Sequence, residues 1–220
     1  MKKNILGCIF DLDGVIVDTA KYHYQAWKRL ANQLGFDFTH EQNELLKGVS
    51  RKKSLEILLA IGGLTLDEET CQKLMTQKNH WYLEFIEKMT PAEILPGVLD
   101  FLSELKSQKI KTAIGSASKN TMMILHQIQL DHYFDAIIDG NKVAQAKPDP
   151  EVFLKGAEAL GLLPEQCIVF EDAIAGIDAA KNAKMIAVGI GEVNALQHAD
   201  LVIPSFVGIT FDDVLQKATK

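Results

Sequence analysis

Two aspartates, Asp11 and Asp13, follow directly on the apolar run 5–10, in the segment Phe10-Asp11-Leu12-Asp13-Gly14. In open parallel α/β sheets, ligands bind beyond the carboxyl ends of the strands. Two carboxylates this close repel each other unless a cation or a proton lies between them. Taken alone, the Asp-x-Asp-Gly pattern could instead be a calcium loop or a solvated turn.

Further polar residues follow other apolar runs. Ser116 precedes a predicted helix, where its hydroxyl and backbone N–H groups could hold an anion or form an ordinary helix cap. Lys147 stands before a proline and, by itself, could be a surface lysine. Glu171 and Asp172 follow the run 167–170, where acidic residues could simply favour a helix N-terminus. Together, in this order, these residues predict one polar site at the ends of several strands.

Apolar runs alternate with segments of helical spacing along most of the chain. Six runs have the length and continuity of buried strands, at 5–10, 110–114, 136–138, 167–170, 185–190 and 201–203. Helical segments lie between them at 97–108, 119–129, 149–160 and 173–183. This alternation predicts an α/β fold, with a Rossmann-like parallel sheet and helices on both faces.

The stretch from about 20 to 89 differs because it contains helical patterns and no convincing strand. Its predicted helices cover 20–34, 41–47, 51–61 and 67–88. We therefore expect an inserted α-helical cap domain at 19–90 and an α/β core domain made of 1–18 and 91–220. The connections at 18–19 and 90–96 would be the hinges between the two.

Composition narrows the class of protein. The chain has 220 residues and a net charge of −6, which argues against nucleic acid as a partner. The three cysteines form no CxxC pair, so buried reduced thiols are expected. The first apolar run is too short for a signal peptide or a membrane span. We expect a cytoplasmic enzyme without a membrane partner, and nothing in the sequence demands more than a monomer.

The ordered set of an Asp pair, a Ser, a Lys before Pro and an acidic pair resembles the haloacid dehalogenase-like superfamily. The resemblance covers essentially the whole chain. It implies that Asp11 is the nucleophile that takes up a phosphoryl group, and that Asp13 is the general acid and base. It implies Mg²⁺ held by the carboxylates of Asp11 and Asp172 and the backbone carbonyl of Asp13, with Glu171 binding directly or through water.

Two more roles come from the same resemblance. Lys147 would add a fixed positive charge, orient Asp11 and contact the phosphoryl group. Ser116 and neighbouring backbone N–H groups would hold its oxygens. The core loops depart from the family pattern at Asp139-Gly140-Asn141-Lys142, Ala146 and Asp149, which affects expectations for cap closure rather than for the chemistry.

Segments 11–20, 46–51 and 116–120 resemble, more narrowly, the β-phosphoglucomutase family. A mutase that works through a sugar bisphosphate needs a second phosphate site. The turn before Arg51 and its guanidinium would form this site, although the basic run 51–53 could also be a solvated helix start. The resemblance gives His23 and Thr19 roles in moving Asp13 as the cap closes, whereas a lone histidine is more often structural.

The residues expected to contact substrate come from cap and core. They are Trp27, Lys47, Gly48, Val49, Ser50, Arg51, Ser54, Lys78, Ser116, Ala117, Ser118, Lys119, Asn120 and Lys147.

The resemblance implies a small-molecule sugar phosphate as substrate. The expected reaction interconverts β-D-glucose 1-phosphate and β-D-glucose 6-phosphate through an aspartyl-phosphate. β-Glucose 1,6-bisphosphate would be the intermediate and a candidate priming agent. The alternatives are a sugar-phosphate phosphatase of the same superfamily and a non-catalytic metabolite-binding protein.

Overall fold

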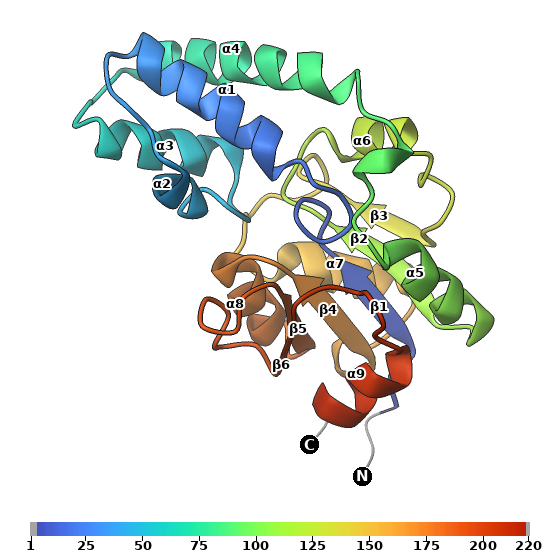
Figure 1. The fold of residues 1–220 in the computed structure, drawn as a ribbon. Coiled ribbons are helices and arrows are strands. Elements are labelled where there is room, and N and C mark those ends of the chain that lie inside the picture. Colours follow the sequence, from blue (N-terminus) through green and yellow to red (C-terminus); the bar gives the residue numbers. More distant parts are fainter. Residues whose placement is uncertain (1–3, 219–220) are drawn as a thin grey trace.

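The computed structural model describes residues 4–218. Its centre is a six-stranded parallel sheet in the order β3-β2-β1-β4-β5-β6 (Figure 1). The strands are β1 Gly7–Phe10, β2 Lys111–Gly115, β3 Ala136–Ile138, β4 Cys167–Glu171, β5 Ile186–Ile190 and β6 Leu201–Ile203. All six predicted strands are therefore confirmed: β3 and β6 have the predicted ends, and the ends of the other four differ by at most two residues.

Side chains of the central strands alternate between two hydrophobic cores because successive residues of a strand point to opposite faces. Cys8 and Phe10 belong to one core, and Ile9 between them belongs to the other. Both faces of the sheet are covered, which explains why the strands read as continuous apolar runs.

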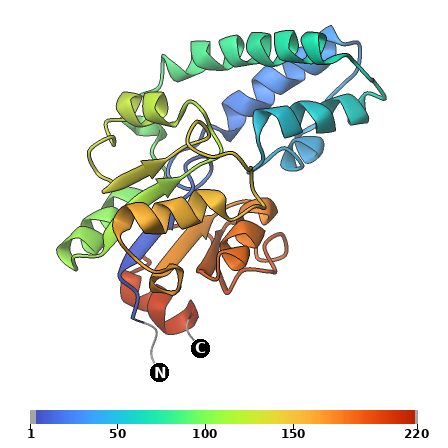
Figure 2. The ribbon, with the colours of Figure 1, turned by 180° about the vertical axis from the view of Figure 1, so that it is seen from behind.

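Helices cover each face of the sheet (Figure 2). The core of Phe10 contains buried residues of α5 Val98–Ser107, α6 Thr121–Gln127 and α9 Phe211–Ala218. The core of Ile9 contains those of α7 Glu151–Leu160 and α8 Ile174–Asn182. The α/β fold class with helices on both faces is confirmed. The predicted start of the helix at 119–129 is wrong. The helix begins at Thr121, because the Ser118 hydroxyl accepts from Asn120 N in a turn that precedes it.

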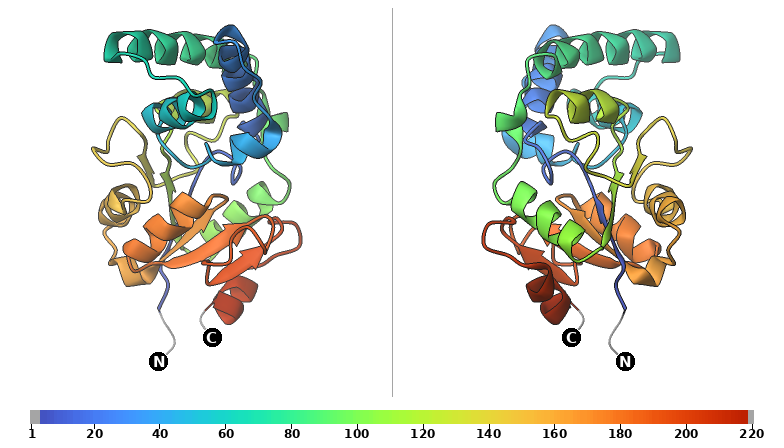
Figure 3. Two further views of the ribbon diagram at one scale, coloured as in Figure 1. Left: turned by 90° about the vertical axis from the view of Figure 1, so that its left-hand side faces the viewer. Right: turned by 90° about the vertical axis from the view of Figure 1, so that its right-hand side faces the viewer.

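Four further helices lie beyond one end of the sheet, far from α9 (Figure 3). They are α1 Ala20–Gln33, α2 His40–Glu44, α3 Arg51–Ile61 and α4 Glu68–Ile86. Three begin at side-chain caps: Thr39 forms a capping box, and Ser50 and Asp67 accept backbone N–H groups. We call α1 to α4 the cap helices. No helix in the described part of the chain is long and apolar enough to cross a membrane.

Two connections run side by side between the sheet and the cap helices. Asp18 N donates to Glu93 O at 3.1 Å, and Leu95 N donates to Ile16 O at 3.0 Å. The Glu93 side chain also accepts from Tyr22 of α1 at 2.8 Å. We propose that the chain divides here, into a core domain of 1–18 and 91–220 and a cap domain of 19–90.

The sheet is anchored by an aromatic cluster on one face. The rings of Phe10 and Phe170 stack at 4.9 Å, and Phe101 meets Phe170 edge-on at 5.4 Å. Phe170 is fully buried and directly precedes the acidic pair at the end of β4.

Replacing Phe170 with alanine should lower the free energy of unfolding by about 3–5 kcal/mol, because it leaves a cavity in this cluster. Urea denaturation measures the change. The control Val193→Ala, at a side chain that is 63% exposed, should stay within about 0.5 kcal/mol. Equal effects of the two substitutions would contradict this account of the core.

Candidate active site

The centre of the sheet brings the first and last acidic motifs together. β1 and β4 are neighbours although most of the chain separates them, and Asp11 N donates to Phe170 O at 2.9 Å. β1 is followed in the sheet by β2 on one side and by β4 on the other, so the strand order reverses at this point. Such a switch point leaves a crevice at the carboxyl ends of the strands. Asp11 and the pair Glu171-Asp172 stand at its two sides.

Lys147 connects the two acidic strand ends. Its Nζ lies 2.5 Å from Asp11 Oδ1 and 2.8 Å from Glu171 Oε2, and all three side chains are buried. Burial alone would lower the pKa of Lys147, but the two carboxylates outweigh it and hold that pKa above its ordinary value. The lysine is therefore a fixed positive charge beside Asp11.

One lysine does not balance the carboxylates at this site. Oxygen atoms of Asp11, Glu171 and Asp172 all lie within 4.8 Å of one another. Among the described residues, the Asp172 carboxylate has no hydrogen-bond or ion-pair partner. Its burial, and then the charges of Glu171 and Asp11, raise its pKa well above the ordinary value. A cluster of hard oxygen donors with excess negative charge fits the Mg²⁺ ion that the family resemblance implies.

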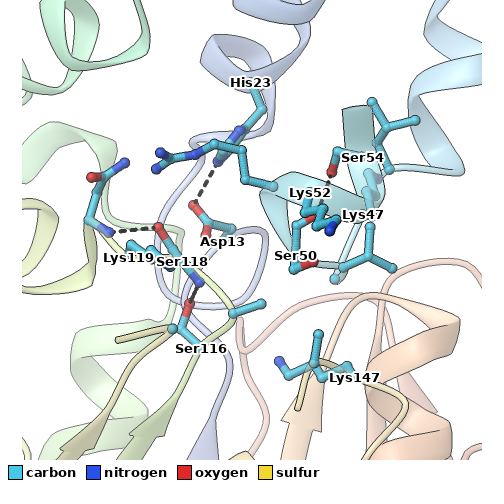
Figure 4. A pocket seen from close by; sticks show the side chains of 18 of the residues that line it. Asp13, His23, Lys47, Ser50, Lys52, Ser54, Ser116, Ser118, Lys119 and Lys147 are labelled. Atoms are coloured by element: carbon cyan, nitrogen blue, oxygen red, sulfur yellow. Dashed lines mark hydrogen bonds and ion pairs between the residues drawn. The ribbon is translucent and has the colours of Figure 1, made fainter. Parts of the chain in front are cut away.

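Asp13 faces the cap. Its Oδ1 accepts a hydrogen bond from the Thr19 hydroxyl and lies 4.0 Å from Nε2 of His23 on α1 (Figure 4). Burial, and then the charge of Asp11, raise the pKa of Asp13 to about 6. This carboxyl group can therefore exchange protons near neutral pH.

The other nitrogen of His23 meets a buried lysine. Lys78 Nζ on α4 lies 2.9 Å from His23 Nδ1, and the Tyr82 ring stacks on the imidazole at 4.1 Å. Burial, and then the charge of Lys78, lower the pKa of His23 well below its ordinary value, which favours a neutral ring. When Lys78 is an ammonium group, which only donates, Nδ1 accepts and the ring proton lies on Nε2, toward Asp13. This contact links the cap to Asp13.

The loop after β2 forms another wall of the site (Figure 4). Ser116 is buried, and its hydroxyl accepts from Ser118 N at 3.1 Å. The loop that departs from the family pattern supports it: Asn141 Nδ2 donates to Lys119 O at 3.0 Å, and Gly140 N donates to Ser118 O at 3.1 Å. The unusual sequence at 139–142 therefore braces the Ser116 loop.

Cap and core residues enclose one cavity of about 440 Å³. Almost all predicted site residues line it, and Thr19 and Glu171 do not. Thr19 donates a hydrogen bond to Asp13, and Glu171 accepts one from Lys147, so each contacts a residue of the cavity wall without lining the cavity itself. The predicted residues that line the cavity are Asp11, Asp13, His23, Trp27, Lys47, Gly48, Val49, Ser50, Arg51, Ser54, Lys78, Ser116, Ala117, Ser118, Lys119, Asn120, Lys147 and Asp172.

The cap side of this cavity is rich in cations. Arg51 is the first residue of α3, and its guanidinium makes no hydrogen bond or ion pair with any described residue. Its charge helps to lower the pKa of Lys78, after the larger effect of burial. Trp27 lies beside this lysine, whose Nζ is 4.6 Å from the indole ring centre. The cavity thus has carboxylates on the core side and uncompensated positive charge on the cap side.

Two asparagines at the site were not among the predicted site residues. Asn79 of α4 accepts a hydrogen bond at 3.0 Å from Asn120, which joins the cap to the loop before α6. Asn43 of α2 also lines the cavity. The position of Asn79 next to the predicted site residue Lys78 could have indicated it. Nothing in the polar segment around Asn43 distinguishes that residue from its neighbours.

The geometry agrees with a comparison of the sequence with protein families. The family model described as haloacid dehalogenase-like hydrolase matches residues 8–190, from β1 to the end of β5. The chain belongs to the haloacid dehalogenase-like hydrolase family. Its members with known structures include a β-phosphoglucomutase from Clostridium difficile, which is 42% identical and superposes with a TM-score of 0.92 over 97% of each chain.

Related sequences of this family carry two kinds of names. A β-phosphoglucomutase from Bacillus subtilis is 43% identical, over 93% of this chain and 91% of its own. A phosphorylated carbohydrates phosphatase from Thermotoga maritima is 31% identical, over 87% of this chain and 85% of its own. The comparisons therefore establish a haloacid dehalogenase-like enzyme and leave mutase and phosphatase as its candidate activities.

Gly14 allows the Asp172 carboxylate to approach the first motif. Its φ is +83°, and an added Cβ would lie 2.2 Å from Asp172 Oδ2. Gly35 is a matched control, because its φ is +92° and an added Cβ would meet nothing within 4 Å. An alanine at either position would be strained by the positive φ, but only the alanine at position 14 would also collide with Asp172.

Gly14→Ala should weaken Mg²⁺ binding by about tenfold or more, in the range seen when residues that support metal ligands are changed. Gly35→Ala should leave Mg²⁺ affinity unchanged. Calorimetric titration of each purified variant with Mg²⁺ measures this. Unaltered affinity in Gly14→Ala would argue against Asp172 as a ligand.

Proposed function

We propose that this enzyme is a β-phosphoglucomutase, which interconverts β-D-glucose 1-phosphate and β-D-glucose 6-phosphate through β-glucose 1,6-bisphosphate. The observation that carries the proposal is the two-ended cavity, with Asp11 and Lys147 at one side and the unpaired Arg51 at the other. A bisphosphate intermediate must bind in both orientations and so needs a phosphate site at each end. The 43% identical Bacillus subtilis relative and the Clostridium difficile structure support this choice.

At the core end, Asp11 would attack phosphorus and carry the phosphoryl group. Lys147 holds the attacking carboxylate by its 2.5 Å contact and would help neutralise the phosphoryl oxygens. The buried hydroxyl of Ser116 and the N–H groups of its loop would bind the same oxygens. Mg²⁺ on Asp11, Asp172 and the Asp13 carbonyl would supply further charge neutralisation. Glu171 would help to bind the ion, and it accepts a hydrogen bond from Lys147.

Asp13 would transfer the proton of the sugar hydroxyl. Its raised pKa of about 6 suits a group that both donates and accepts protons in a reversible reaction. In the structure its carboxyl group is bonded to Thr19 and lies near His23. His23 lies near Asp13 and contacts Lys78, and both residues belong to cap helices. A movement of the cap would therefore move Asp13 toward the sugar hydroxyl.

At the cap end, a tight turn leads into α3. Gly48 has φ +70°, and an added Cβ would lie 2.7 Å from Cβ of Ala173 in the core. Ser50 caps the helix by accepting from Lys53 N at 3.3 Å. The N-terminus of this 11-residue helix and the guanidinium of Arg51 would bind the distal phosphate. Lys119 and Asn120 would contribute from the core.

A phosphatase acting on sugar phosphates is the second candidate. The Thermotoga maritima relative, named as a phosphorylated carbohydrates phosphatase, favours it. The two activities share every core residue and differ in whether water or a sugar hydroxyl accepts the phosphoryl group. A non-catalytic binding protein is disfavoured, because Asp11, Lys147 and the acidic pair are all in contact range.

The deciding assay supplies β-glucose 1-phosphate, Mg²⁺ and a trace of β-glucose 1,6-bisphosphate. We expect glucose 6-phosphate to form in large excess over free phosphate. Asp11→Asn should abolish this turnover, because an amide cannot carry the phosphoryl group. Phosphate without glucose 6-phosphate would establish the phosphatase instead, and turnover by Asp11→Asn would refute the nucleophile.

Arg51→Ala should reduce kcat/KM of the mutase reaction by about 100-fold, because a charge-assisted contact to the distal phosphate is lost. Hydrolysis of acetyl phosphate, which has one phosphate, should change by less than about threefold. The control Lys53→Ala removes a charge from the same helix at a side chain that is 58% exposed, and should alter neither reaction. Equal losses in both reactions would contradict a distal phosphate site.

A further inference from the structure

Asn43 is a buried polar residue of the cap helix α2. It is only 7% exposed, and its side-chain amide makes no hydrogen bond within residues 4–218. Other buried polar groups are paired: Thr112 donates to Tyr133 O, Thr121 donates to Ser118 O, and Ser54 donates to Ser50 O. The Asn43 amide is not sealed from solvent, so water can complete its hydrogen bonds in the free protein, and a bound molecule that displaces this water must replace them.

Asn43 is firmly positioned by its helix. The capping box between Thr39 and Gln42 fixes the start of α2, with Thr39 N donating to Gln42 Oε1 at 2.9 Å. The backbone of Asn43 is fully used, because its N–H donates to Thr39 O and its carbonyl accepts from Leu46 N. The side chain alone is free for another partner, and it lines the cavity between cap and core.

A second unpaired group makes the contrast clear. The hydroxyl of Tyr82 also lacks a hydrogen bond among the described residues, but it is sealed from solvent and the residue does not line the cavity. A ligand could not reach it without movement of the cap. Asn43 combines an unpaired amide with a position on the cavity wall, so a bound molecule can complete its hydrogen bonds.

The chemistry of an amide selects the kind of ligand group. A carboxamide both donates and accepts, whereas a phosphate oxygen mainly accepts. The phosphate-binding groups proposed above are charged or are N–H and O–H donors, and the one side-chain amide among them, Asn120, also donates to Asn79. The group that matches an amide is a hydroxyl, which also donates and accepts. A sugar that spans the cavity presents such groups along its ring.

We propose that Asn43 is a specificity-determining residue that hydrogen-bonds a ring hydroxyl of the sugar phosphate. This inference rests on the proposed function only in that the substrate is a hexose phosphate. It assigns the recognition of ring stereochemistry to α2, in addition to the phosphate contacts of α3. A site built to bond a hydroxyl rejects analogues that lack it, because its own polar group is then left unpaired.

The test pairs changes in the protein with changes in the sugar. Wild type, Asn43→Ala and the nearly isosteric Asn43→Asp are assayed with β-glucose 1-phosphate and its 2-, 3- and 4-deoxy analogues. Thermal unfolding of each variant shows that it is folded. Gln72→Ala is the matched control, because Gln72 lines the same cavity but is exposed and already donates to Glu68 at 3.1 Å.

Both Asn43 variants should lose about tenfold or more in kcat/KM with β-glucose 1-phosphate. One deoxy analogue should already be a poor substrate of wild type, because it lacks the hydroxyl that Asn43 binds. With that analogue, the Asn43 substitutions should lower kcat/KM by less than about a further twofold, since the hydrogen bond is already absent. Acetyl phosphate hydrolysis and the Gln72→Ala variant should be unchanged. Equal losses with every sugar and with acetyl phosphate, or no loss with any, would overturn the proposal.

The same series separates this inference from the proposed function. If wild type releases only phosphate from these sugars, the mutase proposal fails. Phosphate release from the deoxy series then tests Asn43 by the same non-additive pattern. If wild type acts as a mutase and the Asn43 losses are additive at every ring position, the inference on Asn43 fails alone.

Discussion

The candidate site depends on a buried ion pair at the centre of the sheet. Asp11 and Glu171 end adjacent strands, and the single buried ammonium of Lys147 joins them. Burying one such ion pair costs several kcal/mol per ion, so it persists only where packing holds the partners together. Stacked Phe10 and Phe170, directly before the two carboxylates, provide that packing. The remaining negative charge at Asp172 makes this edge of the sheet a site for a cation.

The cap carries charge of the opposite sign. Lys78 is buried between aromatic rings, and Arg51 has no acidic partner among the described residues. Such an arrangement is unfavourable in the free protein and becomes favourable when an anion enters. The cap side of the cavity therefore attracts an anionic group, and the carboxylates on the core side attract a cation. The same anion would draw cap and core together and exclude water from Asp11.

Asp13 couples these two halves. It belongs to the same short segment as Asp11, yet its carboxyl group contacts the hinge residue Thr19 and lies near His23 of the cap. Proton transfer at the core can therefore depend on the position of the cap. Asn79 and Asn120 form a second link across the same boundary. In the proposed mutase, such links would suppress phosphoryl transfer to water while the cap is open.

The sequence by itself determined the strand and helix order, because buried parallel strands read as apolar runs and polar residues mark their ends. It also pointed to the residues proposed as catalytic, since Asp11, Ser116, Lys147 and Asp172 follow such runs or precede a helix. Only the tertiary structure decided which groups lie behind the cavity, as Thr19 and Glu171 do, and which line it. It alone revealed the unpaired amide of Asn43, because whether a polar side chain has a partner depends on packing between elements that are distant in the chain.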